Sequence, residues 1–555
     1  RDRIRNLTFR IVILALLCVF LPFRSFSDIP LPEHPRPDHW RADWQNLNGE
    51  WDFQFDLENK GEIEKWFEKT REFSQTINVP FSWGAPLSGV EDTGDIGWYK
   101  NEILVPESWK GKRVFLVIGA SDWTTSGWLD NNVIGQNRGG YTPFEFELTS
   151  YVKFGEKQNL ILRVDDKDHE FKLEGKQGYG KARGIWQTIY LEARGEVFVD
   201  YVHITPDIRE NEIIIEGQLS DPVNNAANLE ISIKGEDGND HDYSILLKKR
   251  DKVFKQRVSI PDARLWTLED PHLYGVNVHL EVNNESKDNL NTYFGMREIG
   301  VANVPGTDYP YVTLNNEPVY LQLALDQAYH PEGFYTFPSD AFMRDEIIRS
   351  KQIGLNGQRI HVKIGIPRKL YWADKIGLLI MADVPNSWGE PDQEMRYETE
   401  KALRDMIKRD YNHPSVFSWI IFNETWGLFT NQDEEKRSYL PETKEWVIEM
   451  YELAKSLDPI RLVEDNSANR RDHVATDLNT WHAYLPGYSW KEFLKDAVEN
   501  TYEGSPWNFS EGYTQGKQPM LNSECGNVWG YQGSTGDVDW SWDYHIMINE
   551  FRLQP

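Results

Sequence analysis

Apolar, strand-like segments alternate with helix-like segments from about residue 298 to the end of this 555-residue chain. This alternation is typical of βαβ units and predicts a parallel TIM barrel over residues 298–555. A closed barrel has eight strands, and we find seven, so we expect a barrel that is truncated before strand eight. The expected helices include Asp340–Gln352, Tyr397–Arg409 and Glu442–Ser456. The expected strands are Val319–Leu325, Gly357–Val362, Gly377–Val384, Val416–Glu424, Arg461–Asn466, Asn479–Tyr484 and Pro519–Glu524.

Two glutamates end two of these strands. Glu424 ends the fourth strand and Glu524 ends the seventh, and catalytic side chains of α/β barrels emerge at the carboxyl ends of strands. Two carboxyl groups facing one sugar can hydrolyse its acetal, because one protonates the leaving oxygen while the other attacks the sugar or stabilises its cation. We therefore expect a glycosidase with Glu424 as general acid/base, its pKa raised so that it holds a proton, and an ionised Glu524 as nucleophile. A carboxyl separation of about 5–5.5 Å would make the mechanism retaining.

The residues before the barrel are rich in short strand patterns and lack long helical ones. Residues 28–196 contain turn clusters such as Asp130-Asn-Asn132 between strands, which predicts a two-sheet sandwich of the jelly-roll kind. Residues 197–297 repeat this pattern at the size of an immunoglobulin-like sandwich, with strands at Glu212–Glu216, Leu229–Ile233 and Tyr274–Leu280.

The N-terminus has the pattern of a secretory signal over residues 1–27. Basic residues precede the apolar run Ile11–Phe23, which is too short for a membrane span, and small residues follow it. We expect an exported protein, periplasmic or extracellular, with no stable membrane span after signal cleavage; a short membrane anchor is the alternative. The mature chain would keep one cysteine, Cys525, and thus no intrachain disulfide. The net charge of −28 argues against a nucleic-acid partner.

Several motifs in order along the chain resemble glycoside hydrolase family 2, the family of bacterial β-galactosidases and β-glucuronidases. Asn423-Glu424 resembles that family's acid/base motif and Ser523-Glu524-Cys525-Gly526 its nucleophile motif, with Cys525 where an aromatic residue is common. The jelly-roll, immunoglobulin-like and barrel-entry segments also resemble the family, through Gly97-Trp98-Tyr99, Arg183-Gly-Ile-Trp186, Leu265-Trp266 and Phe294-Gly-Met-Arg297.

The resemblance implies roles for residues near the strand ends. Asn423 would hydrogen-bond the sugar 2-hydroxyl, and Arg359 would orient a catalytic carboxylate, unless it forms a plain ion pair. Asp326 and Asp383 would bind sugar hydroxyls or cap the following loops. The remaining candidates for substrate contact are His361, His482, Tyr484 as a partner of the nucleophile, and Trp388, Trp426 and Trp529 as a sugar platform.

The expected activity is that of a retaining exo-β-glycosidase acting on an oligosaccharide or glycoside, with β-galactosidase as first choice. β-Glucuronidase and β-mannosidase are alternatives, and a carbohydrate-binding protein without catalysis is an alternative of another class. Oligomers are possible. No cofactor is expected: there is no Cys/His cluster with zinc spacing and no phosphate loop. Family analogy leaves a divalent cation open, but no ligand set for it can be named.

Overall fold

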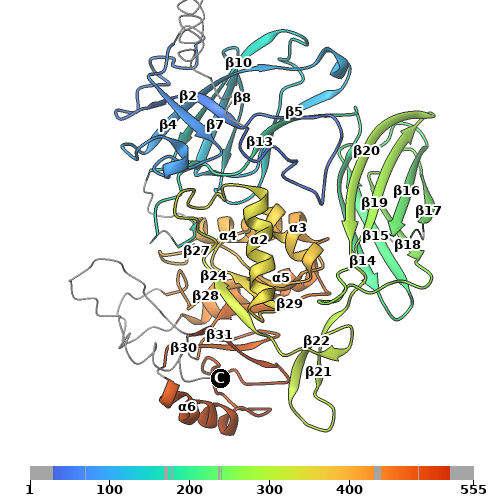
Figure 1. The fold of residues 1–555 in the computed structure, drawn as a ribbon, viewed down its shortest axis with the longest axis vertical. Helices are drawn as coiled ribbons and strands as arrows, with labels where there is room; N and C mark the ends of the chain where they lie inside the picture. Colours follow the sequence, from blue (N-terminus) through green and yellow to red (C-terminus); the bar gives the residue numbers. More distant parts are fainter. Residues whose placement is uncertain are drawn as a thin grey trace, which may run out of the picture.

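The computed structural model describes residues 29–525, except 69–70, 168–172, 177–178, 236–237, 239, 430–438, 470 and 486. These residues form two β-sandwiches and a parallel α/β unit (Figure 1). The expected multidomain class of jelly-roll-like sandwich, immunoglobulin-like sandwich and TIM barrel is confirmed. The expected signal sequence, Trp529 and the expected truncation after strand seven lie outside the described residues.

The first sandwich, blue in Figure 1, consists of two antiparallel sheets. Its core is formed by aromatic and aliphatic residues from both sheets, among them Trp51, Phe53 and Leu116. Two short 3₁₀ turns, η1 (Pro86–Ser88) and η2 (Glu107–Trp109), join its strands. One sheet has the order β1 (Trp44–Asn46), β13 (Ile189–Arg194), β5 (Arg113–Ile118), β9 (Phe144–Glu147). The other has the order β3 (Gln75–Val79), β2 (Gly49–Phe55), β4 (Ile96–Leu104), β10 (Lys157–Asp165), β7 (Thr124–Leu129), β8 (Asn132–Arg138).

Two short strand pairs supplement these sheets. β6 (Ser121–Asp122) pairs with β12 (Gly184–Ile185) inside the first sandwich. β11 (Leu173–Glu174) of the first sandwich pairs with β27 (Asn386–Ser387) of the barrel unit. The second pair therefore fixes a loop of the first sandwich against the barrel.

The second sandwich is green in Figure 1 and consists of two antiparallel sheets, the larger of which turns polar residues such as Asn228, Glu230 and Ser232 outward. Buried and more exposed residues alternate along β16, as expected for a sheet that packs on one face only. The smaller sheet has the order β14 (Val199–Asp207), β15 (Glu212–Leu219), β18 (Val253–Ser259). The larger has the order β17 (Asp240–Leu247), β16 (Ala227–Gly235), β19 (Tyr274–Val282), β20 (Glu285–Phe294). A small antiparallel sheet, β21 (Ile299–Asn303), β22 (Pro310–Leu314) and β23 (Glu317–Pro318), leads into the barrel.

All seven expected barrel strands are present and parallel. Five form one sheet in the order β24 (Leu323–Asp326), β25 (Gly357–Ile360), β26 (Leu379–Asp383), β28 (Val416–Asn423), β29 (Leu462–Ser467). The other two, β30 (Asn479–Ala483) and β31 (Met520–Cys525), form a parallel pair. A hydrogen bond of 3.0 Å from His482 N to Ala468 O links β30 to the segment after β29. The chain therefore places the carboxyl ends of its strands on one side.

The helices follow the expected pattern. They are α2 (Asp340–Gln352), α3 (Pro367–Ile376), α4 (Gln393–Asp410), α5 (Pro441–Leu457) and α6 (Gly487–Asn500). Ser339 caps α2 by accepting from Phe342 N, and Asp392 caps α4 by accepting from Met395 N. β24 begins later than expected, because Val319 N donates to Val312 O at 2.9 Å and so continues the hairpin of β22 and β23.

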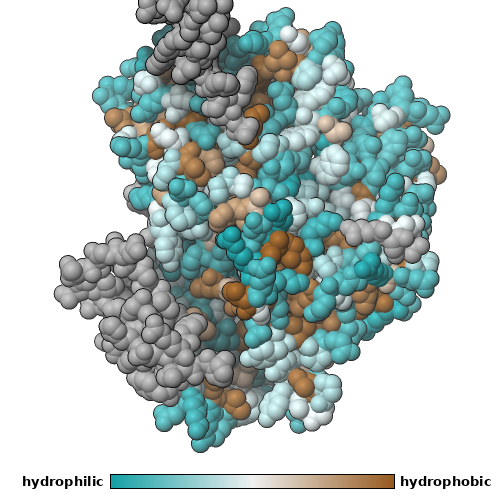
Figure 2. Space-filling model, viewed as in Figure 1, coloured by the Kyte–Doolittle hydropathy of each residue, from teal (hydrophilic) through white to brown (hydrophobic). Residues whose placement is uncertain are grey.

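Each unit has its own hydrophobic core, and the surface over these cores is mostly polar. The two sandwiches have separate clusters of buried side chains, and the barrel cluster also includes residues of the first sandwich such as Trp123, Tyr141 and Trp186. On the face seen in Figure 2, hydrophobic residues form small patches among hydrophilic ones. No helix among the described residues combines the length and apolar character needed to cross a bilayer.

Arg41 joins the two sandwiches through buried ion pairs. Its guanidinium donates to both carboxylate oxygens of Asp288 on β20 at 2.8 and 2.9 Å, and to Glu192 on β13 at 3.1 Å. The exposed fraction of the Arg41 side chain is 3%, and that of Asp288 is 2%. Arg113 also joins the sandwiches, through Glu147 and Asp221, but its side chain is 28% exposed.

We predict that Arg41→Met lowers the free energy of unfolding by about 3–5 kcal/mol, because it leaves Asp288 buried without its cation. Arg113→Met, the matched control, should cost less than about 1 kcal/mol, because solvent screens its ion pairs. Denaturant unfolding followed by circular dichroism checks both values. Equal destabilisation by the two substitutions would contradict the prediction.

Candidate active site

Side chains from six barrel strands meet at the carboxyl ends of those strands. Each residue lies at or within two positions of the end of its strand, or directly after it, as expected where catalytic groups of a barrel emerge. Hydrogen bonds or ion pairs link them into one cluster. The cluster comprises Arg359, Asp383, Asn423, Glu424, Ser467, His482, Tyr484 and Glu524.

The two glutamates converge as the sequence predicts. One carboxylate oxygen of Glu424, one of Glu524 and a ring nitrogen of His482 lie within 4.8 Å of one another. The β30–β31 register contributes to this, because it sets His482 directly beside Glu524. Retaining glycosidases hold their two carboxyl groups about 5–5.5 Å apart, and inverting ones about 6.5–9.5 Å. The separation found here belongs to the shorter class.

Two donors hold Glu524 in place. Arg359 Nη1 donates to its Oε1 at 3.1 Å, and the Tyr484 hydroxyl donates to its Oε2. Burial and the neighbouring Glu524 carboxylate raise the pKa of Tyr484, so the phenol stays protonated and remains a donor. With both oxygens bonded, the Glu524 carboxylate has a fixed orientation.

Arg359 is itself held by two neighbouring strands. Its guanidinium forms a bidentate pair with Asp383 on β26, with contacts of 2.8–3.2 Å, and donates to Asn423 Oδ1 on β28 at 2.8 Å. Burial alone would lower the pKa of Arg359, but Asp383 and Glu524 outweigh it and raise this pKa. Burial would raise the pKa of Asp383, and Arg359 more than offsets that effect, so both groups are charged.

The pKa of Glu424 differs from the raised value that the sequence predicts. Its carboxylate accepts from His482 Nδ1 at 2.7 Å and from Trp426 Nε1 at 3.1 Å. Burial favours the protonated carboxyl, but the hydrogen bond and charge of His482 favour the carboxylate more strongly and lower the pKa of Glu424 to about 2. The raised pKa predicted for the acid/base is therefore wrong for the substrate-free protein, because His482 was not foreseen as its partner.

The backbone at Glu424 has a conformation that needs support. Glu424 and Thr425 have φ values of 51° and 62°, in the left-handed region that costs L-residues roughly 1–2 kcal/mol each. Asn466 stabilises this turn, because its side chain accepts from Thr425 N at 3.0 Å and donates to Thr425 Oγ1 at 2.8 Å. Glu424 N also donates to Ser467 O at 2.8 Å. The turn points the Glu424 carboxylate toward His482 instead of continuing β28.

Asn466 and Ser467 were not among the expected site residues. Ser467 Oγ lies 3.0 Å from His482 Nε2 and 2.9 Å from Ser523 Oγ, so it helps to orient His482. The sequence did contain a signal for them, because Asn466 ends the fifth expected strand and Ser467 directly follows it, where the same strand-end rule applies.

Other expected residues have different surroundings. Asp326 pairs with Lys369 of α3 and accepts from Ala328 N at 2.7 Å, which is the loop-capping alternative. His361 Nδ1 lies 3.5 Å from oxygens of Asp383 and Glu524, and burial lowers the pKa of His361. Trp388 is 44% exposed and its ring centroid lies 5.4 Å from that of Trp426.

The cluster of Glu424, His482 and Glu524 has the residue types and spacing of a metal site. However, both oxygens of Glu524 already accept hydrogen bonds, and one donor is the positively charged Arg359. A cation bound there would be repelled by the guanidinium 3.1 Å from the carboxylate. The residues fit a pair of reacting carboxyl groups better than a metal ion.

Comparison with known proteins gives the same architecture. Three family models match in order: the sugar binding domain of glycosyl hydrolases family 2 at residues 44–192, a further domain of that family at 197–297, and its TIM barrel domain at 312–545.

Among curated relatives, the chain is 26% identical to a β-galactosidase of Thermoanaerobacter pseudethanolicus, covering 71% of this chain and 52% of that protein. It is 24% identical to a β-glucuronidase of Bacteroides fragilis, covering 83% and 66%. The chain thus spans between half and two thirds of the length of these relatives.

Among solved structures, a β-glucuronidase from Ruminococcus gnavus in complex with D-glucuronic acid has a TM-score of 0.72 at 19% identity, covering 95% of this chain and 90% of that one. A Bacteroides uniformis β-glucuronidase covalently bound to a cyclophellitol-6-carboxylate aziridine has a TM-score of 0.70 at 22% identity, covering 88% and 59%. At these identities the likeness establishes the fold. The ordered family matches go further, and this chain belongs to glycoside hydrolase family 2.

Proposed function

We propose that this protein is a retaining exo-β-glycosidase, with Glu524 as nucleophile and Glu424 as general acid/base. The observation that carries the proposal is the convergence of these two carboxylates within 4.8 Å, with Arg359 and Tyr484 fixing Glu524. That separation leaves no room for a water between the carboxyl group and the sugar on the nucleophile side, which inversion would need.

The reaction follows from these positions. Glu524 attacks the anomeric carbon and forms a glycosyl ester, while the bond to the leaving oxygen breaks and that oxygen takes a proton from Glu424. Glu424, now a carboxylate, then takes a proton from water. As the proton leaves, the oxygen of this water attacks the anomeric carbon. The ester bond to Glu524 breaks and releases its carboxylate, so the sugar leaves with its original configuration.

The proton for the first step is held by the Glu424–His482 pair. In the substrate-free protein the pKa of Glu424 is about 2, so the shared proton lies on His482 Nδ1, which donates to Glu424 at 2.7 Å. A bound substrate excludes water and disfavours charge on Glu424, which moves the proton toward the carboxyl. His482 is therefore a positioning and proton-holding residue for Glu424.

A loop of the first sandwich and two tryptophans lie near Glu424 at the barrel mouth. β11 of the first sandwich pairs with β27, and Trp388 directly follows β27. Trp388 and Trp426 lie on the Glu424 side, where the leaving group must be, since Glu424 protonates its oxygen. The indoles of Trp388 and Trp426 are therefore placed to contact the leaving group, and exo action stays part of the proposal that rests on the family resemblance.

For the sugar we propose β-galactoside, with β-glucuronide and β-mannoside as alternatives. A glucuronide needs a cation for its carboxylate. In the described part of the site, Arg359 is the arginine that contacts a catalytic carboxylate, and Asp383, Asn423 and Glu524 already occupy its guanidinium. Relatives of both kinds exist at similar identity, and the structural neighbours named above are β-glucuronidases. Export remains a further proposal, based on the N-terminal pattern of residues 1–27.

We predict that Glu524→Gln lowers kcat by at least about 10⁴-fold, because the nucleophile is lost. Glu424→Gln should lower kcat/KM by about 10²–10⁴-fold for alkyl glycosides, which need a proton on the leaving oxygen. The same substitution should cost much less for dinitrophenyl glycosides, whose leaving group needs none. Initial rates of the full-length protein check all three values.

The matched control is Glu317→Gln on β23, which removes an exposed carboxylate remote from the cluster and should leave the rates unchanged. Proton NMR of the first product should show the β-anomer. The α-anomer as first product would overturn the retaining mechanism, and unchanged rates in both active-site variants would overturn the assignment of residues.

A panel of nitrophenyl β-D-galactoside, β-D-glucuronide and β-D-mannoside tests the sugar. We expect the largest kcat/KM for the galactoside, the sugar of the 26% identical β-galactosidase relative. Fastest hydrolysis of the glucuronide would replace β-galactosidase by β-glucuronidase. Binding of oligosaccharides without cleavage of any substrate would favour the carbohydrate-binding alternative.

The pH profile tests the shared proton. We predict that His482→Gln moves the alkaline limb of kcat/KM, because the Glu424 carboxyl must then hold the proton of the acid alone. At the same time the pKa of Glu424 itself should rise from about 2 toward or above the ordinary value, since its hydrogen-bond donor is gone and burial remains. Ser467→Ala keeps the His482–Glu424 contact and should leave the limb in place. An unmoved limb in His482→Gln would contradict the shared proton.

A further inference from the structure

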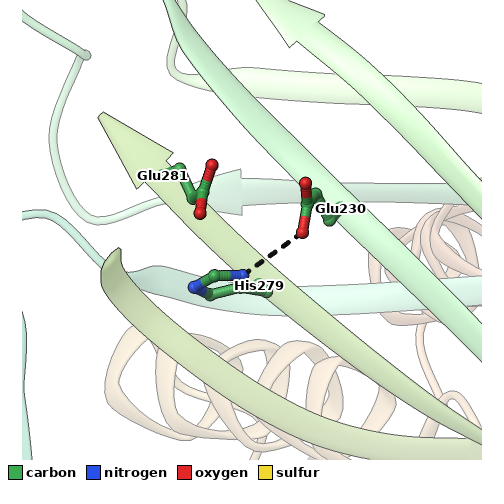
Figure 3. A group of neighbouring side chains, drawn as sticks. All are labelled: Glu230, His279 and Glu281. Carbon is green, nitrogen blue, oxygen red and sulfur yellow. Dashed lines mark hydrogen bonds and ion pairs between the residues drawn. The ribbon is translucent and has the colours of Figure 1, made fainter. Parts of the chain in front are cut away.

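The outer face of the larger sheet of the second sandwich carries three side chains that the proposed reaction does not use. Glu230 lies on β16, and His279 and Glu281 lie two positions apart on β19. Glu230 is directly opposite His279 in the antiparallel register, so all three project from the same face. One carboxylate oxygen of each glutamate and a ring nitrogen of His279 lie within 4.8 Å of one another (Figure 3).

The spacing suits a shared cation better than a hydrogen bond. His279 Nδ1 and Glu230 Oε2 are 3.5 Å apart, beyond the 2.7–3.2 Å of an ordinary N–H···O bond. Two ligands bound at about 2.0–2.1 Å to a tetrahedral ion are about 3.4 Å apart. Figure 3 shows both glutamate carboxylates on the side of the sheet where the imidazole lies.

The imidazole is also oriented as a metal ligand. His279 Nε2 lies 2.9 Å from Ser286 Oγ on β20. When Nε2–H donates to this hydroxyl, the lone pair of Nδ1 faces Glu230. Metal-binding histidines are held in this way by a hydrogen bond from their second nitrogen.

The charges on this face are uncompensated. Among the described residues, no Lys or Arg forms an ion pair with Glu230 or Glu281; the one ion-pair contact of Glu230 is His279. This differs from the cluster at Glu424, where Arg359 supplies a positive charge. The outward residues next to the three side chains are neutral or acidic, namely Asn228, Ser232, Asp242, Ser244, Asn277 and Asn289, and the outward lysine of β16, Lys234, lies four positions from Glu230.

We propose that Glu230, His279 and Glu281 form a binding site for a divalent first-row transition metal ion such as Zn²⁺. Three protein ligands, two carboxylates and one imidazole, leave a fourth position for water. The nitrogen ligand disfavours Ca²⁺ and Mg²⁺, which prefer oxygen. Because the ligands come from two strands, the ion links β16 to β19 and stabilises the folded sandwich.

The test uses the full-length protein freed of metal with a chelator. Calorimetric titration with Zn²⁺ should show one saturable site, and Zn²⁺ should raise the Tm of the protein. Glu230→Gln and His279→Ala should each weaken binding at least about tenfold, and Ser286→Ala should weaken it to a smaller extent, as changes around a ligand do. Ca²⁺ should bind at least about tenfold more weakly than Zn²⁺.

Two controls make the result specific. His241→Ala removes a histidine of the same sheet that is opposite the inward-facing Ile233 and should leave binding unchanged. Glu424→Gln tests the other His–Glu–Glu cluster and should also leave it unchanged. Zn²⁺ binding that persists in both Glu230→Gln and His279→Ala, or that is lost only in Glu424→Gln, would overturn the proposal. Circular dichroism confirms that each variant is folded.

Discussion

The buried guanidinium of Arg359 is the interaction on which the active site depends. It contacts Asp383, Asn423 and Glu524, which come from three different strands, and so holds the ends of β26, β28 and β31 at fixed distances from β25. A charged group buried to this degree is stable only when it is paired and hydrogen-bonded. The dependence is mutual: Asp383 and Glu524 keep the arginine charged, and the arginine orients Glu524 at the point of attack.

The acid/base depends on a second, separate set of contacts. The Glu424 carboxylate accepts hydrogen bonds from His482 and Trp426, and the side-chain amide of Asn466 stabilises the left-handed turn at Thr425. The two catalytic carboxylates therefore have different environments: one beside a permanent cation and a phenol, the other beside an imidazole that can give up a proton. Different environments are what allow two chemically equal groups to take different roles.

The rule that catalytic residues of a barrel lie at the carboxyl ends of its strands predicted much of this site, and the predictions that failed have physical reasons. The apolar run Val416–Asn423 is buried throughout and ends at Glu424, so both the strand and the reactive residue could be predicted. The low pKa of Glu424 could not, because it depends on His482, which is 58 positions away in the chain and is brought near by the β30 register. Asp326 has the same strand-end pattern as Asp383, but Lys369 of α3 lies beside it, and no local pattern reveals a helix partner.

The opposite end of the barrel shows why residue type alone could not identify the site. Arg461, which precedes β29, donates to the carbonyl of Val416 and to Asp458, and Trp419 donates to Asp458 as well. The residue types match those of the active site, an arginine, an acid and a tryptophan. At this end the arginine also donates to carbonyls that begin or precede strands, which fixes the packing of the barrel. At the other end, Arg359 orients Glu524 so that its carboxylate faces that of Glu424. Two neighbouring carboxylates lower stability and contribute nothing to core packing. The position along the strand, and not the composition of the cluster, separates a structural network from a reactive one.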